Sequence, residues 1–135
     1  MSELRISRAW PIILDAPSRV FEHLPEDVKT GHKEHFVAFY LNTRNHWLHY
    51  ETVSIGTLSA SLVHPREVFF PAIAHAAAAL IVAHNHPSGD CTPSAEDRDS
   101  TLRLLRSGEL LGIPLLDHLI VSGLSFYSFK DHGLL

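Results

Sequence analysis

The chain has a single cysteine, Cys91, no long hydrophobic run and no excess of basic residues. One cysteine excludes an internal disulfide and any zinc module built from several cysteines. No stretch approaches the roughly 18 consecutive apolar residues of a membrane span, and the amino-terminal residues lack the pattern of a secretory signal. The net charge of −4 gives no general attraction to phosphate. These absences favour a cytoplasmic protein without a membrane partner, and composition does not favour nucleic acid.

The length and composition fit one globular domain. The chain has 135 residues, of which 45% are hydrophobic, and this is enough to bury a real core. Strand-like and helix-like segments alternate along it without repeats or low-complexity tracts. We therefore expect a single domain of mixed α/β (α+β) class.

The first half of the chain predicts a helix and a β-hairpin from helical apolar spacing and from β-branched and aromatic runs. We expect a weak helix over 17–30 interrupted at Pro25, strands over 36–41 and 47–53 around a turn at 42–45, and a bulge or second turn at Gly56 before 58–63.

The second half predicts alternating helices and strands. Pro65 suits the first position of a helix, and the short apolar run before His84 is typical of a strand buried on both faces. We expect a helix over 65–79 with a kink or break at Pro71, a strand over 80–83, a helix from about Ser94 to the Gly112-Ile113-Pro114 stop, and strands over 115–121 and 126–130 around a turn at 122–123.

The most informative segment is His84-Asn85-His86-Pro87, which is followed by Ser94 and Asp97. Side chains at i and i+2 of an extended chain share a face, so the two histidines point the same way. The residues between Pro87 and Ser94 are rich in turn formers, which allows Asp97 to return to that face. Two imidazoles and a carboxylate form a three-ligand zinc site with an open fourth position.

A simpler interpretation stays open for each part of this segment. The chain has 11 histidines, so a pair at i and i+2 can arise by chance. Ser94 and Asp97 also fit a helix capping box, which needs no metal. The two interpretations are compatible, because a cap at Ser94 could orient the helix that carries Asp97.

The order His84-x-His86-Pro87, six further residues and Ser94-x-x-Asp97 resembles the JAMM signature of zinc-dependent peptidases and isopeptidases in the MPN (Mov34/Pad1) superfamily. The PREV, HNHPSG and DHLIV segments that begin at Pro65, His84 and Asp117 together resemble the bacterial RadC-like branch. The resemblance implies a single MPN (JAMM) domain over 1–135, with a variable lead-in over 1–30 and the RadC-like core over 34–135. It also implies a mixed sheet flanked by helices, in a cytidine-deaminase-like layer arrangement.

The same resemblance implies roles for individual residues. His84, His86 and Asp97 would bind one Zn²⁺ per chain. Glu34, on an earlier strand, would act as general base and then as acid, and Ser94 would help to stabilise an oxyanion. Two other glutamates compete for the role of base. They are Glu51 in the second hairpin strand and Glu67 in the first turn of a helix.

Other chemically interesting residues have weaker support. Asp117 and His118 could orient a ligand histidine, but a role in the core or in bracing a loop is favoured. Cys91 is expected to be a bystander between the ligands. The histidines in and near the hairpin are expected at the surface; these are His32, His35, His46 and His49.

Three functions follow as hypotheses. The first is a metallopeptidase or isopeptidase that acts on a peptide or protein. The second, prompted by the family's association with DNA repair, is an accessory protein or a metal-dependent nuclease; a zinc base deaminase is disfavoured because the chain lacks His-x-Glu with Pro-Cys-x-x-Cys. The third is a scaffold without catalysis, which the complete ligand set argues against. The sequence leaves the oligomeric state open.

Overall fold

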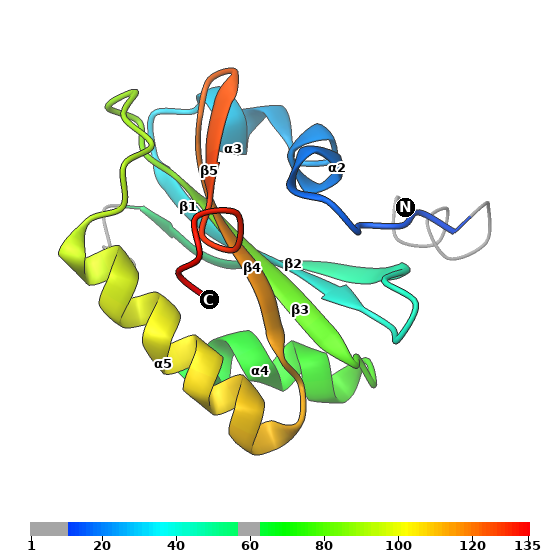
Figure 1. Ribbon diagram of the computed structural model, residues 1–135. Coiled ribbons are helices and arrows are strands. Elements are labelled where there is room, and N and C mark those ends of the chain that lie inside the picture. The colour runs from blue at the N-terminus through cyan, green and yellow to red at the C-terminus, as the bar shows by residue number, and fades with distance from the viewer. Residues whose placement is uncertain (1–10, 57–62) are drawn as a thin grey trace.

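A five-stranded mixed sheet with helices on both faces forms the core of the computed structural model, which describes residues 11–56 and 63–135 (Figure 1). The elements in chain order are α2 (Pro17–Glu22), α3 (Glu26–Thr30), β1 (Glu34–Leu41), β2 (Trp47–Gly56), α4 (Pro65–Ala74), β3 (Ala79–Asn85), α5 (Ala95–Leu111), β4 (Leu115–Ser122) and β5 (Ser125–Ser128). The mixed α/β class expected from the sequence is confirmed.

The sheet order is β2-β1-β3-β4-β5, with one parallel pair in the centre. β1 pairs antiparallel with β2 and β3, β4 pairs antiparallel with β5, and β3 and β4 run parallel. A parallel pair needs a crossover connection, and helix α5 provides it between β3 and β4. The carboxyl end of β3 therefore lies near the start of α5.

Two hydrophobic clusters cover the two faces of the sheet. One joins Tyr40 and Leu80 of the sheet to Val68 of α4 and Leu104 of α5. The other joins sheet residues to α2 and α3, with Leu14, Val20, Leu24, Val28, Phe39 and Ile81 among its members. Every residue of β3 is buried, as expected for a strand covered on both faces. The two candidate histidines, His84 and His86, thus lie at the end of a strand that is packed on both faces.

Several predicted elements are confirmed with shifted ends. The predicted helix over 17–30 is two helices, and Pro25 is the N-cap of the second. The hairpin forms, and its pairing shifts at Val53, between Phe36↔Ser54 and Val37↔Thr52, and again at Leu48, between Tyr40↔His49 and Leu41↔Trp47. The strand β2 ends at Gly56, and the alternative of a second turn after it falls outside the described residues. The segment 58–63 lies, except for its last residue, outside the described residues.

The helix predicted over 65–79 is wrong at its carboxyl end. It begins at Pro65 and runs without a break through Pro71, but it ends at Ala74. The alanines that follow have high helix propensity, yet Ala78 N–H donates to the carbonyl of Leu41 and Ala79 pairs with Leu41 in the sheet. Pairing with β1 therefore overrides local propensity.

The last strand is shorter than the predicted 126–130. It ends at Ser128, and the next residues form turns. Lys130 N–H donates to the Asp117 carboxylate at 3.0 Å instead of continuing a ladder. Within the described parts of the chain, no helix has the length and apolar character needed to cross a bilayer.

Candidate metal centre

Three side chains with ligand atoms meet where β3 ends and α5 begins. The Nε2 atoms of His84 and His86 are 3.0 Å apart. The Asp97 carboxylate oxygens lie 3.0 Å from His84 Nε2 and 3.1 Å from His86 Nε2. In a tetrahedral zinc site with bonds near 2.0 Å, neighbouring ligand atoms are about 3.3 Å apart. The structure thus brings the three predicted ligands into a triangle that could hold a metal ion.

A capping box at the start of α5 orients Asp97 toward the histidines. Ser94 Oγ accepts a hydrogen bond from Asp97 N–H at 3.0 Å, and Asp97 Oδ2 accepts one from Ser94 N–H at 2.8 Å. The capping interpretation of this motif is therefore confirmed, and the same contacts direct the carboxylate into the triangle. Asp97 is only 3% exposed, so its charge needs partners close by.

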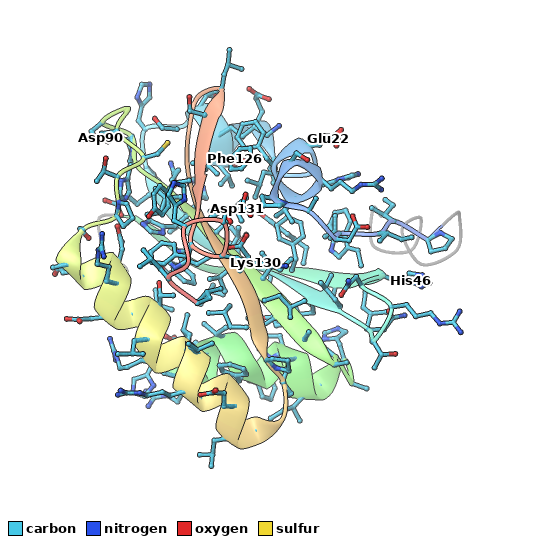
Figure 2. The ribbon with its side chains drawn as sticks, viewed as in Figure 1. Glu22, His46, Asp90, Phe126, Lys130 and Asp131 are labelled. Carbon is cyan, nitrogen blue, oxygen red and sulfur yellow. The ribbon has the colours of Figure 1, made fainter. Side chains whose placement is uncertain are left out.

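The loop between β3 and α5 fixes the ring of His86. Its Nδ1 lies 2.8 Å from the carbonyl oxygen of Asp90. Asp90 belongs to this loop and is labelled in Figure 2. A carbonyl only accepts, so Nδ1 carries the hydrogen and the Nε2 lone pair of a neutral His86 faces Asp97. Lone pairs of nitrogen and oxygen at 3.1 Å repel one another unless a proton or a metal ion lies between them.

The charges within the triangle shift the pKa values of its members. The hydrogen bond to Asp97 raises the pKa of His86, although partial burial opposes it. Burial alone would raise the pKa of Asp97, but hydrogen bonds from His84 and His86 hold it well below its usual range. Without a metal, a shared proton thus links the carboxylate to the imidazoles. A metal cation can replace that proton, because metal ligands bind in their deprotonated forms.

Glu34 lies beside this triangle at the start of β1. The antiparallel register places Phe36 opposite His84, and the two rings stack with centroids 5.8 Å apart. Because alternate residues of a strand share a face, Glu34 lies on the same face as Phe36, toward His86. Glu34 and His86 both line a hollow of about 440 Å³. The placement suits a base beside a metal, and the role itself stays a prediction.

Asn85 holds the backbone on either side of Glu34, a role that sequence reasoning missed. Its Oδ1 accepts a hydrogen bond from His35 N–H at 2.6 Å, and its Nδ2 donates to the Lys33 carbonyl at 2.9 Å. Asn85 is 1% exposed, and it stands between the two candidate histidines in the sequence. One residue therefore ties the strand that carries Glu34 to the strand that carries His84.

The two other candidate bases have partners elsewhere. Glu51 Oε1 lies 2.7 Å from Nε2 of His49 in the second hairpin strand. Glu67 accepts a hydrogen bond from His64 N–H at 3.3 Å in the capping box of α4. Of the three glutamates, only Glu34 lines the hollow beside His86.

Asp117 and His118, which are neighbours in the sequence, have separate roles. The Asp117 carboxylate accepts hydrogen bonds from Ser128 Oγ at 2.6 Å, from Lys130 N–H at 3.0 Å and from His118 N–H at 2.7 Å. It therefore braces the turn after β5, as the favoured interpretation expects, and burial raises its pKa. The His118 ring instead lies 2.9 Å from His84 Nδ1.

The remaining sequence candidates lie away from the triangle. Cys91 Sγ donates to the carbonyl of Ser125 at 3.6 Å, and burial raises the pKa of its thiol. The expectation of surface histidines is wrong for His35, which is 9% exposed. His35 is buried because it lies in β1, in which every residue after Glu34 is buried, and its Nδ1 lies 3.0 Å from the Lys33 carbonyl.

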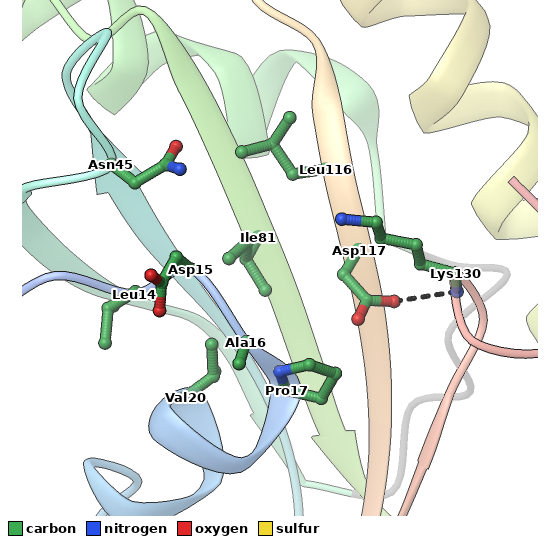
Figure 3. Close-up of a pocket in the computed structure, with 10 residues that line it drawn as sticks. All are labelled: Leu14, Asp15, Ala16, Pro17, Val20, Asn45, Ile81, Leu116, Asp117 and Lys130. Atoms are coloured by element: carbon green, nitrogen blue, oxygen red, sulfur yellow. Dashed lines mark hydrogen bonds between the residues drawn. The ribbon is translucent and has the colours of Figure 1, made fainter.

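A second, smaller cavity of about 160 Å³ lies on the face of the sheet covered by α2 (Figure 3). Apolar residues and four polar ones line it together; the polar ones are Asp15, Asn45, Asp117 and Lys130. The Asp117 carboxylate in its wall is already bonded to Lys130 N–H, as the dashed line in Figure 3 shows. This cavity is separate from the histidine triangle.

A mixed sheet with two imidazoles at a strand end and a carboxylate at the following helix start defines a class: α/β domains with a candidate mononuclear metal site. Within that class, the chain belongs to the RadC-like JAB domain family, whose pattern matches residues 14–134. The family suggested by the sequence motifs is thereby confirmed.

Curated bacterial proteins are similar over most of the chain. A UPF0758 protein of Geobacillus sp. (strain WCH70) is 49% identical over 129 residues, which are 96% of this chain and 57% of that protein. A UPF0758 protein of Geobacillus thermodenitrificans is 51% identical over 121 residues, covering 90% of this chain and 54% of that protein. One from Desulforamulus reducens is 49% identical over 124 residues, covering 92% and 55%. The chain thus spans about half the length of these relatives.

Proposed function

We propose that this domain is a zinc-dependent hydrolase of the JAMM type that cleaves peptide or isopeptide bonds. The observation that carries the proposal is the triangle of His84, His86 and Asp97, which borders the hollow lined by Glu34. Two imidazoles and one carboxylate suit zinc, and catalytic zinc sites keep the fourth position open for water. A peptide or protein is the proposed substrate, and a cytoplasmic location is proposed with it.

The chain's own residues account for the other parts of such a reaction. A zinc ion held by His84, His86 and Asp97 would lower the pKa of a water molecule toward neutrality and would polarise a carbonyl. Glu34 would take the proton of the attacking water and return it to the leaving amine. The Ser94 hydroxyl accepts from Asp97 N–H, so its own hydrogen can be directed to the oxyanion of the substrate. Asn85 would keep Glu34 in place through the backbone.

The test compares Glu34→Gln with the parent protein in a fluorogenic peptide-library screen, with zinc content measured on the same samples. We expect Glu34→Gln to keep its zinc and to lose at least about a hundredfold in rate, since acid–base groups contribute about 10²–10⁴-fold. Glu109→Gln, at an exposed position of α5, is the matched control and should cleave at the parental rate.

Two results would contradict the proposal. One is a Glu34→Gln variant that cleaves as fast as the parent. The other is a zinc-loaded parent that cleaves no peptide but degrades DNA or binds it with a steep salt dependence, which would favour the nuclease or accessory alternative.

A further inference from the structure

A buried chain of hydrogen bonds leads from His84 through β4 to helix α5. His84 Nδ1 lies 2.9 Å from His118 Nε2, and His118 Nδ1 lies 2.6 Å from Thr101 Oγ1. Thr101 Oγ1 in turn donates to the Asp97 backbone carbonyl at 2.6 Å. The three side chains are between 0% and 2% exposed, so water does not compete for these bonds.

The chemistry of the last acceptor fixes the direction of every bond. The Asp97 carbonyl can only accept, so the Thr101 hydrogen is committed to it and Oγ1 must accept from His118 Nδ1–H. A neutral His118 then has a bare Nε2, which accepts from His84 Nδ1–H. In a neutral His84, the nitrogen left without hydrogen is then Nε2, the atom that faces Asp97 in the triangle.

Packing holds the His118 ring in this orientation. The ring stacks on Phe129, with centroids 4.7 Å apart and planes 8° apart, and it meets Phe36 edge to face at 5.8 Å. Because these neighbouring rings are apolar and both nitrogens of His118 already have partners, His118 has no alternative hydrogen bond among these neighbours. We call this chain of hydrogen bonds from His84 through His118 and Thr101 to the Asp97 carbonyl the relay. With both histidines neutral, only one placement of hydrogens satisfies every bond in it.

We propose that Thr101 and His118 act as positioning residues that hold His84 in the tautomer able to bind a metal through Nε2. This proposal rests on the metal site of the proposed function and adds two residues that do not touch the ion. Asp97 then acts in two ways. Its carboxylate is part of the triangle, and its backbone carbonyl, through Thr101 and His118, sets which nitrogen of His84 carries the hydrogen.

The test removes one hydroxyl from the relay. Thr101→Val keeps the shape of the side chain but leaves His118 Nδ1–H without an acceptor. The rings of His118 and His84 are then no longer held in one tautomer. Thr101→Ser keeps the hydroxyl and is the matched control. We expect Thr101→Val to weaken zinc binding about 10-fold to 100-fold, measured by competition with a chelator, as for other partners of metal-bound histidines. Thr101→Ser should stay within about threefold of the parent.

A second measurement needs no variant. ¹⁵N chemical shifts of the histidine rings in the metal-free parent should show His118 protonated on Nδ1 and unprotonated on Nε2. Protonation of His118 on Nε2, or a Thr101→Val protein that binds zinc as tightly as Thr101→Ser, would overturn the relay. A parent that binds no zinc would contradict the proposed function instead, and the ring shifts would still decide the relay.

Discussion

At the scale of single residues, the geometry of the site depends on side chains that fix their neighbours as much as on the three candidate ligands. Asn85 bonds to the backbone on both sides of Glu34, and Ser94 exchanges two hydrogen bonds with Asp97 across the first turn of α5. The His35 N–H group that donates to Asn85 belongs to a buried residue. A buried donor that loses its partner keeps its full cost of desolvation, so Asn85 should matter for stability as well as for geometry.

Asn85→Ala should lower the free energy of unfolding by about 1–3 kcal/mol, because His35 N–H and the Lys33 carbonyl lose their partner. Asn42→Ala is the control: Asn42 Oδ1 also accepts two backbone hydrogens, at 2.9 and 3.0 Å, but in a more exposed turn. The control should cost less. Equilibrium denaturation measures both, and an Asn85→Ala protein as stable as the parent would refute the role of this clamp.

At the scale of elements, the end of α5 decides how closely the helix approaches β4. A Cβ on Gly108 would lie 2.5 Å from the Ile113 carbonyl oxygen and 3.2 Å from the Leu115 nitrogen. Both atoms belong to backbone that cannot rotate away. Gly112, with φ of 74°, turns the chain in the left-handed region and returns it to the sheet.

Gly108→Ala should therefore destabilise the protein by about 1–3 kcal/mol, as expected of overpacking. Helix propensity alone predicts the opposite sign, since alanine is better than glycine by about 1 kcal/mol inside a helix. Glu109→Ala, one residue further and exposed, should change stability little. Thermal and denaturant unfolding distinguish the two, and a stabilised Gly108→Ala protein would show that the helix end can shift.

The range of the interactions along the chain decides which features the sequence could predict. The end of β3 at the histidines and the start of α5 at Ser94 depend on local patterns and turn residues. The end of α4 depends on pairing between Ala79 and Leu41, which no local pattern shows. The contacts of His118 with His84 and Thr101 depend on the parallel register, in which Val82 pairs with His118. Sequence reasoning weighed His118 but had no means of finding Thr101.

At the scale of the whole molecule, the site lies where a parallel strand pair meets its crossover helix. In open α/β sheets, ligands bind outside the carboxyl ends of the parallel strands. Here that position unites β3, α5 and the first residues of β1, which three different sequence segments supply. Covering helices on both faces keep these elements in register (Figure 1).

The pKa shifts define how the metal-free triangle depends on pH. The lowered pKa of Asp97 contributes stability above its unfolded value of about 3.9 that is lost as pH falls. The raised pKa of His86 contributes stability below about 6.5 that is lost as pH rises through the folded value. The contribution of the metal-free triangle to the free energy of unfolding is therefore largest between about pH 4 and pH 6.5. Zinc must displace the proton, so its affinity should increase above that range.

The central claim is that three side chains form one zinc site, and a zinc titration of the intact chain tests it most directly. At pH 7.5 the parent should bind one ion per chain, and binding should weaken at pH 6. His84→Ala should lose this binding, whereas His32→Ala, which changes an exposed histidine that lines the hollow, should keep it. A parent that takes up no zinc, or a His84→Ala protein that binds as the parent does, would contradict the account.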